Sequence, residues 1–236
     1  MALLKWIADK DLMLAVSDLL TKAQKAQNKA ATEFGKNVID PFSAVFQIAG
    51  FGMDDKAWRK SETARQAEKS LQNHIGHFHQ KILGSVKGWD DMKAGGVIDL
   101  KCDKKKIVAE IKNKHNTISG GKLASEYDAL AEVIMPKHSK FKGYTAYLVR
   151  IIPNRPARFD KEFTPSNKGS GALRPSNKQI RTIDGASFYA LVTGRKDALK
   201  ELFDILPRVI YICSKKTISS NTTKMLNVFF DDAFKD

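Results

Sequence analysis

Three residues near the middle of the chain have the types and spacing that could hydrolyse a phosphodiester. Asp99 lies in one short apolar run, and Glu110 and Lys112 belong to the triplet Glu110-Ile-Lys112 in the next. Magnesium prefers hard oxygen ligands and often takes only one or two of them from protein carboxylates. A lysine beside such a metal can orient or deprotonate a water and stabilise charge developing on phosphorus. The three residues therefore predict a phosphodiesterase site with Mg²⁺ as the cofactor.

The elements that must position these residues are predicted to be the two strands of a hairpin. Residues 96–102 and 106–112 are β-prone, and a short polar turn separates them. If the turn is centred on its lysines, Asp99 lies directly opposite Glu110, with Cβ atoms about 4.5–5.5 Å apart. Alternation along the second strand puts Lys112 on the same face as Glu110. The pattern therefore predicts that all three side chains meet.

Two facing carboxylates destabilise a strand pair unless positive charge lies between them. A divalent cation would supply that charge, and this is the functional interpretation. The alternative is an exposed hairpin stabilised by salt bridges, with Lys101 and Lys106 as counterions. The spacing by itself leaves both interpretations open, because so short a pattern has many chance matches.

The composition favours a polyanionic partner. Lys and Arg number 40 against 26 Asp and Glu, which gives a formal net charge of +14. Nucleic acid and an anionic membrane surface are the two candidates. No stretch approaches the roughly 20 apolar residues that span a bilayer, and Lys5 and Asp9 interrupt the first segment, which reads as an amphipathic helix rather than a signal peptide. Nucleic acid is therefore the expected partner.

The two cysteines indicate a reduced compartment. Cys102 and Cys213 have no second cysteine or histidine at a zinc-binding spacing. A disulfide between them stays possible from sequence, but two buried, unreactive thiols are expected. A cytoplasmic location follows.

Several motifs resemble those of the PD-(D/E)xK nuclease superfamily, which includes type II restriction endonucleases. They are residues 95–100, 109–114 and 183–189, together with the helical segment 72–79. The chain looks most similar to the family whose members cut GGNCC sites. Ile98 stands where the superfamily usually has proline before the metal-binding aspartate, and this departure leaves the chemistry unaffected.

The resemblance implies an α/β fold with a restriction-endonuclease-like core, in which helices flank a central mixed β-sheet and an N-terminal helical region precedes it. Asp99, Glu110 and the Ile111 carbonyl would hold Mg²⁺, and Lys112 would serve the attacking water. Attack in line on phosphorus would leave a 5′-phosphate and a 3′-hydroxyl. The resemblance also implies double-stranded DNA as substrate, a homodimer, and a cognate DNA methyltransferase in the same system.

The whole chain, 1–236, is expected to form one domain. Its parts would be a mainly helical region (1–83), a catalytic core (95–152), a DNA-recognition loop (153–182) and the C-terminal part of the core (183–236).

Periodicity predicts the elements within these parts. Helices are expected in the first 35 residues, over 61–82, from a Ser119 cap to Pro136, from an Asp184 cap to Gly194, and over 196–206 up to Pro207. Residues 144–152 and 209–213 are expected as strands, and 38–51 as a buried connection.

Residues outside the hairpin could contribute to binding. Lys114 and His115 follow the Glu-x-Lys strand and are expected to approach DNA. Four more candidates lie in the polar loop, since Arg and Lys can read guanine and Asn can read adenine. They are Arg174, Asn177, Lys178 and Arg181. Non-specific contacts to phosphates are the alternative for these four.

Glu62 could be an auxiliary acidic residue for a second metal or for Lys112. The alternative is a first-turn glutamate that interacts with the helix dipole. His74, His77 and His79 do not converge on one helical face, so no zinc site is expected there. For His77 a phosphate contact or simple packing is expected instead.

Two other functions remain open besides a restriction endonuclease. A structure-specific repair or recombination nuclease could use the same core. A non-catalytic DNA-binding protein could carry the acidic pair for structural reasons only. The long polar loop favours the first function, because a structure-specific nuclease needs less surface for reading bases.

Overall fold

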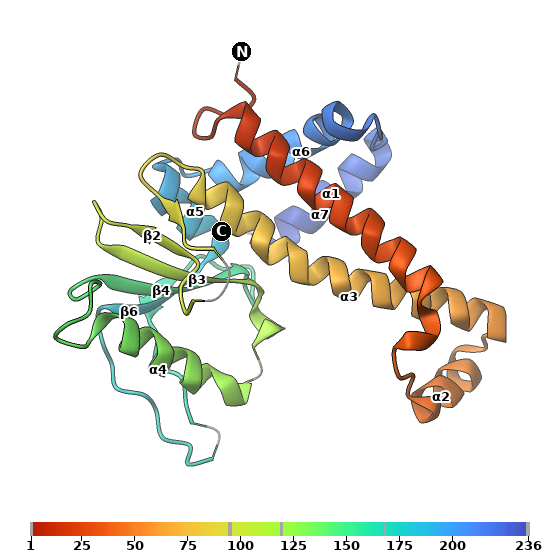
Figure 1. Ribbon diagram of the computed structural model, residues 1–236, viewed down its shortest axis with the longest axis horizontal. Coiled ribbons are helices and arrows are strands. Elements are labelled where there is room, and N and C mark those ends of the chain that lie inside the picture. The colour runs from red at the N-terminus through yellow and green to blue at the C-terminus, as the bar shows by residue number, and fades with distance from the viewer. Residues whose placement is uncertain (1, 94–95, 119, 168, 235–236) are drawn as a thin grey trace.

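The computed structural model describes residues 2–93, 96–118, 120–167 and 169–234. A six-stranded sheet with the order β1-β2-β3-β4-β6-β5 forms its centre, and helices cover both faces (Figure 1). The strands are β1 (Asp90–Asp91), β2 (Leu100–Cys102), β3 (Ile107–Lys114), β4 (Thr145–Ile152), β5 (Asp160–Glu162) and β6 (Ile180–Asp184). The helices are α1 (Asp9–Thr32), α2 (Pro41–Phe51), α3 (Asp55–Gly84), α4 (Leu123–Ile134), α5 (Gly185–Thr193), α6 (Ala198–Ser214) and α7 (Ser220–Phe234).

The sheet is mixed, as expected. β1, β2 and β3 are antiparallel neighbours, β3, β4 and β6 run parallel, and β5 is antiparallel to β6. Leu100 pairs with Ala109 and Cys102 with Ile107, which confirms the predicted register of the hairpin. Crossover helix α4 joins β3 to β4 and packs on one face of the sheet, where it contacts β4.

Alternation along β3 divides its side chains between two apolar layers. Ile107, Ala109 and Ile111 belong to the layer shared with α1, α3, α5 and α6. Val108 belongs to the layer under α4, together with Leu148 of β4. The period-two pattern therefore places the even-numbered polar residues of β3 on the α4 face.

Helix α5 begins where β6 ends and lies very close to β4. The carboxylate of Asp184 accepts a hydrogen bond from the Ser187 N–H at 2.8 Å, so the predicted cap is confirmed. A Cβ atom at Gly185 would lie 2.4 Å from the Ile151 carbonyl oxygen. Only glycine permits this approach of helix to strand.

The prediction of a buried connection over 38–51 is wrong. Asp40 accepts hydrogen bonds from the N–H groups of Phe42 and Ser43, and Pro41 occupies the first turn, so helix α2 forms. Its apolar side chains Phe42, Val45 and Phe46 are 77%, 63% and 75% exposed. Apolar composition suggested burial, but the local cap placed the segment on a helix that projects from the fold.

Two further boundaries differ from prediction. Asp54 caps α3 at residue 55, ahead of the expected start, by accepting from the Ala57 N–H. Helix α6 continues through Pro207, so the helix end at Pro207 and the strand over 209–213 are both wrong. Val209 is fully buried in the first apolar layer. Burial of α6 residues at helical spacing thus stabilises the helix by more than the hydrogen bond missing at Pro207 costs.

The 153–182 segment is not structureless, because it contains β5 and most of β6. The Ser119 cap and the first glycine of the 95–100 motif lie outside the described residues. Cys102 is buried, Cys213 is half-buried, and both are free thiols. Within the described part of the chain, no helix is long and apolar enough to cross a membrane.

Candidate active site

The hairpin brings Asp99 to the unpaired edge of β3. Strand β2 begins at Leu100, and the Asp99 N–H donates to the Ala109 carbonyl at 2.8 Å. Beyond that point no backbone group of the described β2 residues pairs with β3, and the Asp99 carboxylate accepts the Ile111 N–H at 2.7 Å instead. The N–H and C=O of a strand residue point to the same edge. The Ile111 carbonyl is therefore directed to the side where Asp99 lies.

Glu110 and Lys112 lie side by side on the α4 face of β3. The Lys112 Nζ donates to Glu110 Oε1 at 2.6 Å and lies 3.6 Å from Glu126 Oε1 at the start of α4. The side chains of Glu110 and Lys112 are only 15% and 22% exposed. One ammonium therefore neutralises carboxylates from two elements in a largely desolvated place.

Electrostatic strain is concentrated on the two facing carboxyl groups. Burial raises the pKa of Glu110, and the Asp99 charge adds to it, so that it reaches about 7 although Lys112 opposes the shift. Burial also raises the pKa of Asp99, against the hydrogen bonds from Ile111 and Glu110. Near neutral pH the pair therefore retains a proton that two separate carboxylates would lose.

Lys112 stays a cation in this arrangement. Burial acts to lower its pKa, but the hydrogen bond and the charge of Glu110, with smaller contributions from Glu126 and Asp99, outweigh burial and raise the pKa. The side chain is thus better suited to holding a water or a phosphate oxygen than to removing a proton. This refines the sequence interpretation, in which both roles were open.

Helix α3 provides the opposite wall of the site. Gln80 is 4% exposed and donates to Asp91 Oδ1 at 2.7 Å and to the Asp99 carbonyl at 3.4 Å. His77 Nδ1 lies 3.3 Å from Gln80 Oε1. The sequence interpretation missed Gln80, although its spacing from His77 on a predicted helix could have indicated a shared face. Gln80 fixes the loop that ends in Asp99.

A cleft of about 520 Å³ lies between α3 and the end of β3. Asp99, Glu110 and Lys112 line it together with Lys114 and His77. The structure therefore brings the three predicted site residues and Lys114 to one open cavity.

The donors in this cleft fit a hard divalent cation. No group of three or more His, Cys, Asp or Glu side chains able to hold a metal occurs among the residues that the structure describes. Magnesium does not need three, since it keeps several waters and takes one or two carboxylates. Burial and the Asp99 charge raise the pKa of Glu110 although Lys112 opposes them, so Lys112 compensates the pair only in part. Two carboxylates and the edge carbonyl of Ile111 match such an ion.

The residues predicted to bind DNA are spread around the sheet. His115 follows Lys114 at the end of β3, and its Nδ1 is buried without a partner. Arg174 forms an ion pair of 2.6 Å with Asp128, in the same helix as Glu126. His115 therefore lies beside Lys114, which lines the cleft. Arg174 lies beside the helix whose Glu126 contacts Lys112.

The other three predicted DNA-binding residues lie elsewhere. Asn177 contacts Met135 just past the end of α4, and Lys178 follows it just before β6. Arg181 is paired with Asp160 at 2.6 Å, and it is in register with Tyr147 on the face opposite to Glu110. The β-branched residues Ile180, Thr182 and Ile183 around Arg181 could have indicated this strand.

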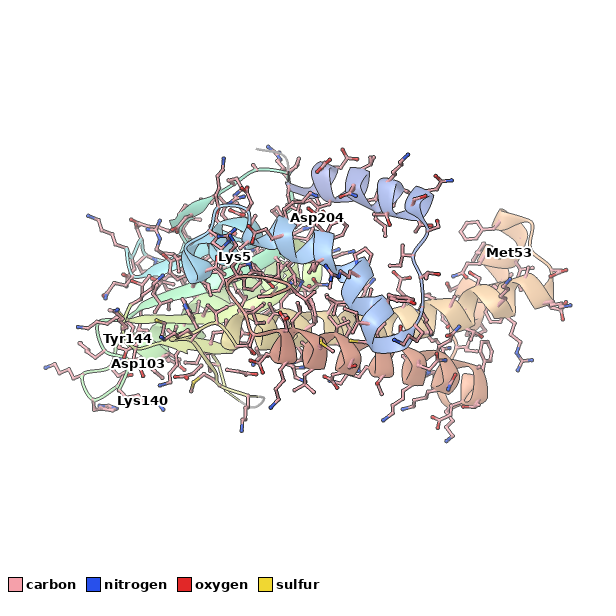
Figure 2. All side chains as sticks on the ribbon, turned by 90° about the horizontal axis from the view of Figure 1, so that it is seen from above. Lys5, Met53, Asp103, Lys140, Tyr144 and Asp204 are labelled. Atoms are coloured by element: carbon pink, nitrogen blue, oxygen red, sulfur yellow. The ribbon has the colours of Figure 1, made fainter. Side chains whose placement is uncertain are left out.

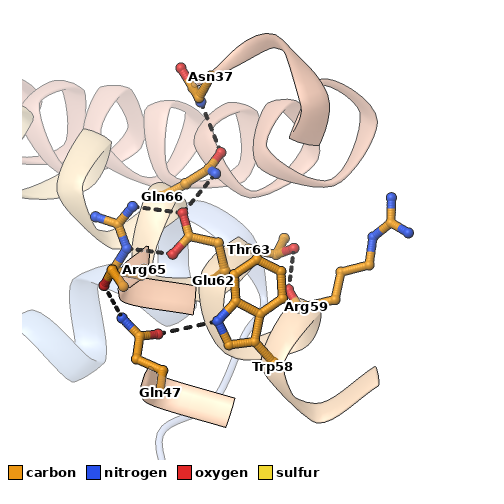
Figure 3. Close-up of polar contacts among 9 residues, drawn as sticks. Asn37, Gln47, Trp58, Arg59, Glu62, Thr63, Arg65 and Gln66 are labelled. Carbon is orange, nitrogen blue, oxygen red and sulfur yellow. Dashed lines mark hydrogen bonds and ion pairs between the residues drawn. The ribbon is translucent and has the colours of Figure 1, made fainter. Parts of the chain in front are cut away.

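Glu62 is not brought to the cleft. It is 7% exposed, and it accepts two hydrogen bonds of 2.6 Å from Arg65 and one of 2.9 Å from Gln66 (Figure 3). The Arg65 hydrogen bonds lower its pKa. Glu62 lies about 27 Å from Gln80 along α3, at 1.5 Å per residue. Since α3 begins at Asp55, a first-turn role is also wrong, and Glu62 stabilises the junction of α3 with Asn37.

His77 and His79 of α3 point to different surroundings, as expected. His79 is half-buried against Tyr189, with its Nδ1 2.7 Å from the hydroxyl, and desolvation lowers its pKa to about 4. His77 lines the cleft instead.

Comparison with known proteins gives concordant matches. The family model described as Eco47II restriction endonuclease matches residues 4–215. Type II restriction enzyme Eco47II of Escherichia coli is 56% identical over 217 residues, which cover 92% of this chain and 90% of that protein. Type II restriction enzyme Sau96I of Staphylococcus aureus is 33% identical over 208 residues, which cover 86% of this chain and 78% of that protein.

The carboxylate pair predicts an unusual pH dependence of stability in the absence of metal. Glu110 keeps its proton up to about pH 7 in the folded state, whereas its ordinary pKa is 4.5. The folded protein therefore binds more protons than the unfolded chain between these values, and Glu110 destabilises the fold as the pH rises. We expect Glu110→Gln to equal wild type near pH 5 and to exceed it at pH 8.5 by about 1–3 kcal/mol in chemical unfolding with EDTA.

Glu201→Gln is the matched control. Its hydrogen bond with Arg195 lowers the pKa of Glu201, so this variant should lose stability at pH 8.5 and approach wild type as the pH falls. An advantage of Glu110→Gln that is the same at both pH values would contradict the electrostatic account.

Proposed function

The chain belongs to the Eco47II restriction endonuclease family and is a type II site-specific endonuclease, and from this premise we propose that it hydrolyses double-stranded DNA at GGNCC sites with Asp99, Glu110 and Lys112. The α/β sheet between two helical layers is the restriction-endonuclease-like core. The observation that carries the assignment of residues is the destabilised carboxylate pair beside a lysine in an open cleft.

We propose Mg²⁺ as the cofactor, held by Asp99, Glu110 and the Ile111 carbonyl. The metal, when bound, would acidify a water and offset charge on the phosphate. The Ile111 N–H holds the Asp99 carboxylate in place, and Gln80 holds the loop before it. Both constraints position the ligands before substrate arrives.

Lys112 completes the site as a fixed cation. Its hydrogen bond to Glu110 and its contact with Glu126 hold the ammonium on the α4 face of β3, where Lys112 lines the cleft. From there it can donate to the attacking water and to a non-bridging phosphate oxygen. Attack in line on phosphorus leaves the products as a 5′-phosphate and a 3′-hydroxyl.

The net charge of +14 supports DNA as the polyanionic partner. Lys114, His115 and Arg174 are the proposed contacts nearest to the cleft. Asn177 and Lys178 remain proposed contacts at the other end of α4. Arg181 is not proposed as a DNA contact, because it is ion-paired with Asp160 on the face of the sheet opposite to Glu110.

We propose a homodimer, because one chain supplies one carboxylate pair and a duplex has two strands to cut. The exposed stripe of α2, formed by Phe42, Val45 and Phe46, is the proposed surface for the second copy. Its spacing of i, i+3 and i+4 is that of a helix-packing face. Figure 2 shows Met53, just after α2, at the opposite end of the molecule from Asp103 and Tyr144.

The activity has consequences for the host. An enzyme that cuts GGNCC would also cut the chromosome of its own cell, so we propose a cognate DNA methyltransferase that protects those sites. The substrate DNA lies in the cytoplasm, which is the proposed location.

Plasmid digestion tests the proposed function. With Mg²⁺ we expect discrete fragments whose ends fall at GGNCC, and with EDTA we expect intact plasmid. Lys112→Ala and Asp99→Ala should lower the cleavage rate at least about 10²-fold, since each removes a group that acts on the transition state. Binding of a GGNCC duplex, measured by anisotropy in Ca²⁺, should be largely retained by Lys112→Ala.

Other outcomes would favour the alternative functions. Preferential cutting of branched DNA would indicate a structure-specific nuclease. Retarded but intact DNA with Mg²⁺ would indicate a non-catalytic binder. Near wild-type cleavage by either variant would show that the active site lies elsewhere.

Sedimentation tests the dimer. We expect wild type to sediment as a dimer and Phe46→Asp to sediment as a monomer, because a charge would be buried in the interface. The variant should keep the circular dichroism spectrum of the folded chain, since Phe46 is exposed within one chain. Leu14→Asp is the matched control on α1, where Leu14 is 63% exposed, and it should remain dimeric. A dimeric Phe46→Asp protein would exclude α2 as the interface.

A further inference from the structure

Among the described residues, four buried side-chain polar atoms lack a hydrogen-bond partner, and three of them belong to residues at or near the ends of β3 and β4. In the described part of the chain they are Asn113 Oδ1, His115 Nδ1, Arg150 Nε and Arg174 Nε. A buried polar group without a hydrogen bond costs about 1–3 kcal/mol, so such groups require an explanation. Asn113 and His115 lie at the end of β3, and Arg150 lies near the end of β4. The polar groups at these strand ends are therefore available to hydrogen-bond a bound ligand.

Arg150 is the residue of this group that the sequence interpretation overlooked. It is in register with Lys112 on the neighbouring parallel strand, just as Leu148 is in register with Glu110. Arg150 therefore projects from the α4 face, as Glu110 and Lys112 do. Adjacent strands are about 4.8 Å apart, so its guanidinium group can reach the surroundings of Lys112.

The charge of Arg150 is not compensated within the described residues. Its side chain makes no hydrogen bond and no ion pair there, and burial alone lowers its pKa. The nearest register neighbour on β6 is Asp184, whose carboxylate is already engaged by the N–H groups of Ser187 and Phe159 and by Arg158.

The other arginines are either ion-paired or exposed. Ion pairs hold Arg65, Arg158, Arg174, Arg181 and Arg195. Arg59, Arg155 and Arg208 are exposed to solvent. Arg150 differs from all of them because it is half-buried and unpaired among the described residues. Its Nε is buried without a hydrogen bond among these residues, which destabilises the free fold until an anion supplies the missing acceptor.

We propose that Arg150 binds a phosphate of the DNA strand being cut, at the scissile bond or directly next to it. Guanidinium groups bind phosphate with two parallel hydrogen bonds, which Lys112 cannot provide. Arg150 would thus supply the second fixed cation of the site, on the strand beside Lys112. This inference rests on the proposed function of the Asp99, Glu110 and Lys112 cleft.

Arg150→Met is the decisive variant, because methionine fills similar volume without charge. We expect it to weaken binding of a GGNCC duplex in Ca²⁺ about 10- to 100-fold, as for loss of a charged hydrogen bond. Single-turnover cleavage in Mg²⁺ should fall by at least the same factor. Thermal unfolding of the free protein should occur at an equal or higher temperature than in wild type, because a guanidinium whose buried Nε has no partner among the described residues has been removed. A lower unfolding temperature, or failure to fold, would show a structural role and overturn the proposal.

Arg195→Met is the matched control. This arginine is paired with Glu201 and precedes α6, away from the ends of β3 and β4. The control should keep wild-type binding and cleavage, and it should not gain thermal stability.

Duplexes with single methylphosphonates locate the contact. Each replaces one charged phosphate by a neutral group, and each is titrated against wild type and Arg150→Met. At the scissile phosphate or an adjacent one, the replacement should weaken wild-type binding but have little further effect on the variant. The proposal would be overturned if the replacement weakened binding by the same factor in wild type and in Arg150→Met at the scissile phosphate and at both adjacent phosphates.

Lys112→Ala, assayed in parallel, separates the two hypotheses. If Lys112→Ala is inactive while Arg150→Met binds and cuts normally, only the role of Arg150 is wrong. If Lys112→Ala cuts normally, the proposed active site itself is wrong.

Discussion

One unfavourable interaction dominates the proposed active site: the carboxyl groups of Asp99 and Glu110 approach each other where both are largely shielded from solvent. Asp99 and Glu110 face each other because β2 and β3 pair in a single register. Burial and mutual repulsion raise the pKa of Glu110 to about 7. The Ile111 N–H and the Lys112 ammonium relieve only part of this repulsion. A site that retains a proton near neutral pH is prepared to exchange it for a metal cation.

The rest of the fold holds this pair in place. The apolar residues of β3 fix the strand between two layers, so Glu110 and Lys112 cannot turn away from the α4 face without exposing the core. Buried Gln80 ties the loop before β2 to α3. The parallel strands β3 and β4 end at the same edge, where Arg150 and Lys114 add positive charge. The family assignment is consistent with this geometry, which places cations around a carboxylate pair.

Local signals predicted the hairpin well and its surroundings less well. Turn position and alternation suffice for the register that opposes Asp99 to Glu110, because a strand with one buried face has little freedom to slip. Long-range contacts decided the failures. Helix α6 passes through Pro207 because Val209 packs into the core, and Arg181 belongs to a strand because Ile180 and Ile183 are buried on either side of the sheet. Glu62 and Arg150 show that the significance of a charge depends on its partners, which the sequence does not list.

Locating the metal ion is the most direct test of whether Asp99 and Glu110 form the active site. Crystals of the protein with a GGNCC duplex and Mn²⁺ in place of Mg²⁺ would reveal the ion by its anomalous scattering. We expect a peak bonded to one carboxylate oxygen of Asp99 and one of Glu110, with the Ile111 carbonyl as a further ligand. A peak at another acidic cluster, with Asp99 and Glu110 left without metal, would contradict it.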